Sequence, residues 1–72
     1  MSTLPTLKAG ATGDVVKTVQ AVLQAKFNQV GVKVDGDYGA VTAAAVEAVQ
    51  HYLGLKVDGV TGPATWTVLL EA

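Results

Sequence analysis

Two stretches of the chain repeat one pattern. Residues 34–42 read Val34-Asp35-Gly36-Asp37-Tyr38-Gly39-Ala40-Val41-Thr42, and 23 positions later residues 57–65 read Val57-Asp58-Gly59-Val60-Thr61-Gly62-Pro63-Ala64-Thr65. The shared pattern is V-D-G-x-x-G-x-x-T, in which aspartate and glycine are typical turn residues. A weaker copy precedes them, where Gly10 and Gly13 keep the glycine spacing without an aspartate. We therefore interpret the chain as three repeats, in each of which a glycine-rich turn leads into a helix.

Apolar residues after the first turn recur at helical spacing. Val16, Val19, Leu23 and Phe27 follow one another at intervals of three or four. This period predicts a helix from about Asp14 to about Asn28, with these side chains on its buried face.

The other two turns predict a helix each. Alanines with high helix propensity favour a second helix from Ala40 to about Leu53, and Gly54 suits its C-terminal cap. The third helix is expected to begin at Pro63, because the first helical position does not need an amide hydrogen, and to run to the chain end.

The fold class expected from these elements is all-α, a compact three-helix bundle with glycine-rich connecting loops. The connections are too long for a simple hairpin bundle, so they should pack over the core. Four loop side chains are expected to insert there: Leu55, Val57, Val34 and Tyr38. We expect the domain to span residues 7–72, after an N-terminal tail at residues 1–6.

Composition excludes several classes of protein. Five lysines, six acidic residues and no arginine give a net charge of −1, a poor balance for binding nucleic acid. The chain has no cysteine and one histidine, so it lacks a thiol nucleophile and the usual zinc ligands. No apolar run approaches the roughly 20 residues needed to span a bilayer. We therefore expect no nucleic-acid partner, no membrane insertion and no cofactor.

The polar residues do not form a recognisable catalytic set. Asp35 and Asp37 could act as an acid–base pair, but an aspartate before glycine more often stabilises a turn through backbone amides. The same segment resembles part of a calcium loop with too few oxygen ligands. His51 has no nucleophile at a recognisable spacing and is expected to be solvated. We predict no catalytic residue and no metal site.

The ordered set of these residues resembles the peptidoglycan-binding domain family, three-helix modules of bacterial and phage cell-wall hydrolases. The resemblance runs from Leu7 to Leu69 and includes both aspartate–glycine turns. A glutamine also follows each of the two long apolar stripes, in Val19-Gln20 and Val49-Gln50. Val19 and Val49 depart from the family, which usually has leucine and an aromatic residue there.

The resemblance implies noncatalytic binding of bacterial cell-wall peptidoglycan, through its glycan strand or its stem peptide. The domain would tether an attached or associated cell-wall hydrolase or wall-crossing machine to the polymer. The predicted ligand-binding residues lie on the second and third turns and the helix starts that follow: Asp35, Tyr38, Gly39, Asp58, Thr65 and Trp66.

Structural roles compete with ligand contact at several of these positions. Trp66 could belong entirely to the core, whereas the polar tip of Tyr38 favours a half-exposed position. Thr42 and Thr65 are expected to cap their helices. Gln20 and Gln50 are expected to satisfy backbone groups of the loops.

A rival interpretation is a protein-interaction or assembly module, such as a structural part of a phage tail. The first residues have neither the basic region nor the apolar segment of a secretion signal. We therefore expect either a piece of a longer protein or phage-type delivery, with action in the cell wall, the periplasm or outside the cell.

Overall fold

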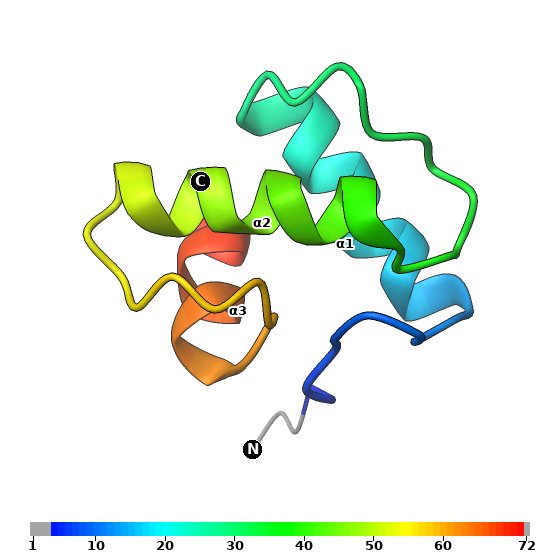
Figure 1. Cartoon of the computed structure of the whole chain (residues 1–72), viewed down its shortest axis with the longest axis horizontal. Helices are drawn as coiled ribbons and strands as arrows, with labels where there is room; N and C mark the ends of the chain where they lie inside the picture. The colour runs from blue at the N-terminus through cyan, green and yellow to red at the C-terminus, as the bar shows by residue number, and fades with distance from the viewer. Residues whose placement is uncertain (1–3, 72) are drawn as a thin grey trace.

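The structure is a computed structural model that describes residues 4–71. It has three helices, α1 (Asp14–Lys26), α2 (Ala40–Tyr52) and α3 (Pro63–Glu71) (Figure 1). This confirms the all-α fold class, and each helix begins at the predicted residue. The first two helices end within two residues of the predicted position. Residues 1–3 of the expected tail and the last residue of the expected third helix lie outside the described residues.

Helix α1 packs against both of the other helices, α2 and α3. Figure 1 shows α2 crossing in front of α1, with α3 below α2. No helix within residues 4–71 has both the length and the hydropathy to cross a membrane. The long connections between the helices pass around the three-helix bundle, as expected from their length.

Backbone pairing ties the connections to one another. The first turn pairs with the second, where the N–H of Tyr38 donates to the carbonyl of Ala11 at 2.9 Å. The N-terminal segment pairs with the third turn through two bonds between Leu7 and Thr61, of 3.0 and 2.8 Å. The three turns are therefore fixed to one another as well as to the helices.

The core contains most of the predicted apolar face of α1, together with residues of α2, α3 and the connections. Its fully or nearly buried members are Leu7, Val16, Val19, Leu23, Val32, Tyr38, Ala45, Val46, Val49, Trp66 and Leu69. Tyr38 therefore inserts into the core as predicted.

Two of the loop side chains expected in the core are exposed instead. Val34 is 43% exposed and Val57 is 49% exposed, whereas Val32, two residues before Val34, is 2% exposed and belongs to the core. Val34 and Val57 hold the same place in the repeat, one residue before the turn aspartate. The same local geometry therefore turns both outward.

Two leucines near helix ends also lie largely outside the core. Leu53 lies one residue past the end of α2 and is 39% exposed. Leu70 is 57% exposed because it lies about 100° around α3 from the buried Leu69.

The end of α2 is capped as predicted at Gly54. This residue has a φ of 75°, and its N–H donates to the carbonyl of His51. The next N–H, of Leu55, donates at 2.8 Å to the carbonyl of Gln50. This pair of bonds is the Schellman motif, in which a left-handed glycine lets the chain reverse over the last helical carbonyls.

Gln20 holds the second turn onto α1. Its Oε1 accepts the N–H groups of Asp35 and Gly36 at 3.0 and 2.9 Å. Its Nε2 lies 3.0 Å from Asp35 Oδ1, 2.9 Å from the carbonyl of Asp37 and 3.1 Å from Thr42 Oγ1. The side chain is 1% exposed, so all its polar atoms are used inside the protein.

Gln50 makes the same set of bonds to the third turn from α2. Its Oε1 accepts the N–H groups of Asp58 and Gly59 at 3.1 and 3.0 Å. Its Nε2 lies 2.9 Å from Asp58 Oδ1 and 3.0 Å from both the Val60 carbonyl and Thr65 Oγ1. These two sets of bonds, which we call the glutamine clamps, confirm that the glutamines satisfy loop backbone.

The glutamine clamps explain why glycine and threonine recur at the same places in the two turns. They also show that the predicted capping role of Thr42 is wrong. Gly36 and Gly59 have φ values of 81° and 72°, a conformation that side chains disfavour, and each presents its N–H to a glutamine. Thr42 does not cap α2, because no side chain bonds the free amides at that helix start. Its hydroxyl instead accepts from a clamp, as that of Thr65 does.

Replacing a clamp glutamine should cost much of the stability of the domain. Gln50→Ala leaves buried turn amides without an acceptor, each at about 1–3 kcal/mol, so we expect the free energy of unfolding to fall by about 2–4 kcal/mol. Urea denaturation followed by circular dichroism measures the change. Gln24→Ala on α1 is the control, since that side chain donates one bond, to the Val32 carbonyl, and should cost under about 1.5 kcal/mol. Equal losses in the two variants would contradict the clamp.

Candidate functional site

The structure separates the six predicted site residues into two groups. Asp35, Gly39 and Asp58 are exposed at the surface of the second and third turns. The side chains of the other three are almost fully enclosed: Tyr38, Thr65 and Trp66, which are 1%, 4% and 4% exposed. The first group, together with Thr65, which lines an open cavity, can touch a ligand without a rearrangement of the core.

Tyr38 links the second turn to the third. Its hydroxyl donates to the carbonyl of Gly59 at 2.7 Å and lies 2.9 Å from Thr61 Oγ1. Burial raises the pKa of Tyr38 above its usual value, against the opposing effect of the Thr61 hydroxyl. The half-exposed position expected for this residue is therefore wrong, because its polar tip finds partners inside the protein.

Trp66 belongs to the core, which is one of the two roles that the sequence allowed for it. Its Nε1–H donates to the carbonyl of Pro5 at 2.7 Å. The indole thus fastens the N-terminal segment to α3, next to the pairing of Leu7 with Thr61.

The two turn aspartates have matching electrostatics. The pKa of Asp35 is lowered, first by the backbone N–H of Asp37 and then by its bond with Gln20. The pKa of Asp58 is lowered in the same way, by the Val60 N–H and then by Gln50. Hydrogen bonds that favour the carboxylate form produce this direction.

Each of these turns borders an open cavity. The first, of about 330 Å³, is lined in part by Lys33, Asp35 and Asp37 at the start of α2. The second, of about 220 Å³, is lined in part by Lys56 and Asp58 at the start of α3. Because the lysines and aspartates hold equivalent repeat positions, both cavities present paired opposite charges.

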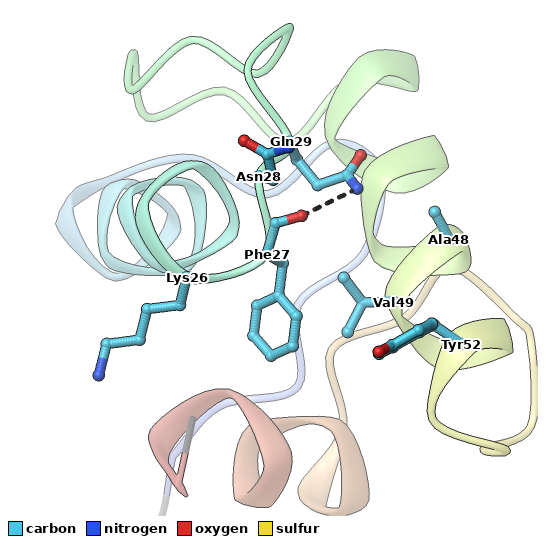
Figure 2. A pocket seen from close by; sticks show the side chains of 7 residues that line it. All are labelled: Lys26, Phe27, Asn28, Gln29, Ala48, Val49 and Tyr52. Atoms are coloured by element: carbon cyan, nitrogen blue, oxygen red, sulfur yellow. Dashed lines mark hydrogen bonds between the residues drawn. The ribbon is translucent and has the colours of Figure 1, made fainter.

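A larger groove lies elsewhere, between the C-terminal ends of α1 and α2. It has a volume of about 430 Å³ and is lined by Lys26, Phe27, Asn28, Gln29, Ala48, Val49 and Tyr52. Figure 2 shows Phe27 on one side of this hollow, with Val49 and Tyr52 facing it from α2. We call this the α1–α2 groove.

The sequence pattern does not indicate this groove as a site. Helical spacing predicts that Phe27 lies on the buried stripe of the first helix, and it predicts no role for Tyr52. A signal was available, because Val49 and Tyr52 are three residues apart and so share one side of a helix. The sequence does not show that the segment after α1 lies opposite these two side chains.

Within residues 4–71, no three His, Asp or Glu side chains gather closely enough to hold a metal ion. His51 lies exposed on α2. All cavities named above are open to solvent, which suits contact with an extended ligand.

The chain belongs to the peptidoglycan binding domain family, whose model matches residues 12–69. It is also similar to solved structures. The SleB N-terminal domain is 35% identical with a TM-score of 0.84, over 93% of this chain and 90% of that one. A peptidoglycan-binding protein from Clostridioides difficile, solved in complex with glutamine hydroxamate, is 36% identical with a TM-score of 0.85, over 96% of this chain and 42% of that one.

A third similar structure is the endolysin of the Burkholderia phage AP3. It is 39% identical with a TM-score of 0.80, over 90% of this chain and 24% of that one. The chain thus corresponds to one part of the clostridial and phage proteins and to nearly all of the SleB domain. No curated protein matches the sequence.

The turn aspartates should make the stability of the domain depend on pH in the acid range. Because their folded pKa values are lowered, the stability they contribute is present above the unfolded value of about 3.9 and is lost as pH falls through the folded values. We expect the melting temperature to fall between about pH 5 and pH 2. The double variant Asp35→Asn/Asp58→Asn keeps the Oδ1 acceptors without this titration, so its melting temperature should fall less. Asp37→Asn is the matched control for loss of a turn carboxylate, because Gln20 binds the backbone carbonyl of Asp37. An unchanged slope in the double variant would contradict the assignment.

The hydroxyl of Tyr38 should contribute stability by joining two turns. Tyr38→Phe removes its bonds to Gly59 and Thr61 and should lower the free energy of unfolding by about 1–2 kcal/mol. Tyr52→Phe is the matched control, because that side chain is 82% exposed. Urea denaturation of both variants measures the difference, and equal stability would refute the link.

Proposed function

We propose that this domain binds bacterial cell-wall peptidoglycan without cleaving it. The observation that carries the proposal is membership of the peptidoglycan binding domain family over nearly the whole chain. The open form of its cavities supports it, because a wall polymer is an extended ligand that an enclosed pocket would not admit.

The proposed role of the contact is tethering. Weak binding to the polymer raises the local concentration of any hydrolase that is joined to the domain or associated with it. The enzyme therefore meets its substrate at a higher rate. The sizes of similar proteins support this view, because the domain covers 24% of the phage endolysin and 42% of the clostridial protein. The proposed place of action is therefore the cell wall.

The proposed contact surface includes the exposed residues of the sequence-based prediction. Asp35, Gly39 and Asp58 border the two turn cavities and stay candidates for ligand contact. The α1–α2 groove is a further candidate, which the sequence did not indicate.

The test is cosedimentation of the purified chain with peptidoglycan sacculi. We expect saturable pelleting that soluble muropeptides compete away, and sacculus turbidity that stays constant during incubation. A soluble protein of similar size and charge controls for trapping, and a salt titration controls for nonspecific charge attraction.

Failure of the folded chain to pellet would overturn wall binding. The rival function, an interaction or assembly module, would then be favoured if the chain formed defined oligomers. Exposed apolar side chains such as Val30 and Val41, which are 76% and 61% exposed, are the ones that such an interface would cover.

A further inference from the structure

We propose that the α1–α2 groove is the part of the domain that holds the glycan strand, by stacking an N-acetylated sugar on Tyr52. This inference rests on the proposed function and names the component of the polymer that is recognised. It concerns a surface separate from the turns that the sequence indicated.

The apolar side of the groove suits a sugar ring. Tyr52 is 82% exposed although it is a large aromatic residue, and it stands beside the partly buried Phe27 and the buried Val49. Figure 2 shows these three side chains around one hollow. The C–H groups on a pyranose face carry partial positive charge, and an aromatic face is negative, so the two attract when stacked.

The polar side of the groove suits hydroxyl and acetamido groups. Asn28 and Gln29 lie next to Phe27 in Figure 2, and each side-chain amide offers both donors and an acceptor. The Nε2 of Gln29 donates to the Phe27 carbonyl at 3.3 Å, which leaves its Oε1 available to a ligand. Asn28 is exposed and has a φ of 58°, so the chain reverses there.

The lining of this groove is mostly uncharged, which suits a neutral sugar ring. A stem peptide carries carboxylates and, in many walls, an ammonium group, which partners of opposite charge would recognise. The groove has no acidic lining residue, and its one charged lining residue is Lys26. Paired lysine and aspartate occur instead at the two turn cavities. The volume of about 430 Å³ lies within the usual range for small-ligand sites.

Exposed positions allow variants that leave the core intact. Tyr52→Ala removes the stacking face and Tyr52→Phe keeps it. Asn28→Gly removes an amide while allowing the left-handed backbone. Leu70→Ala on α3 is the control for loss of an exposed apolar side chain, and Asp35→Asn/Asp58→Asn tests the turns.

The experiment titrates the chain and its variants with a soluble oligomer of N-acetylglucosamine, followed by NMR, alongside sacculus cosedimentation. We expect chemical-shift changes around residues 26–29 and 48–52, and competition of the oligomer with sacculi. Tyr52→Ala should weaken both interactions by about fivefold to tenfold, and Asn28→Gly should weaken them by a smaller factor. Tyr52→Phe and Leu70→Ala should bind like the wild type.

Three results would overturn the proposal. Sacculus binding that survives Tyr52→Ala but is lost in the double turn variant would move the site to the turns. If free stem peptide but not the N-acetylglucosamine oligomer competed away sacculus binding, the glycan strand would be ruled out as the ligand. Both results leave the proposed function standing, whereas absence of pelleting by the wild type would remove that function and this inference together.

Discussion

The burial of two glutamine side chains is the constraint on which the rest of this domain depends. A buried amide without partners is costly, so each glutamine must meet a turn that offers two N–H groups and several oxygens in one place. The aspartate–glycine turns provide these groups in both repeats. Once Gln20 and Gln50 are satisfied, each turn is fixed to the helix that carries its glutamine, and the start of the next helix is fixed with it.

This constraint also explains how a domain with no cysteine holds together without disulfides. A small core leaves little margin, and loops of this length would otherwise lose their order first. The clamps, the hydroxyl of Tyr38 and the indole N–H of Trp66 each join segments that are distant in the sequence. Polar bonds in the interior therefore do much of what cross-links do in other domains of this size.

The surfaces left for a ligand follow from the same arrangement. The turns carry paired charges at their rims because the lysine before and the aspartate within each repeat are duplicated along with the clamp. The α1–α2 groove is not duplicated, since it forms where the chain leaves α1 after Lys26 and passes opposite the end of α2. One surface suits charged groups and the other suits a neutral ring, and peptidoglycan contains both.

The sequence by itself determined the three helices, their starting residues, the cap at Gly54 and the repeated turns, because these depend on local periodicity and turn chemistry. It also indicated the role of Gln20 and Gln50. Only the tertiary structure decided which polar and aromatic side chains face solvent. Tyr38 is buried and Tyr52 exposed although both are tyrosines, because the partners of Tyr38 lie more than twenty residues away on another turn. Exposure depends on such distant contacts, and so the groove could not be found from local pattern.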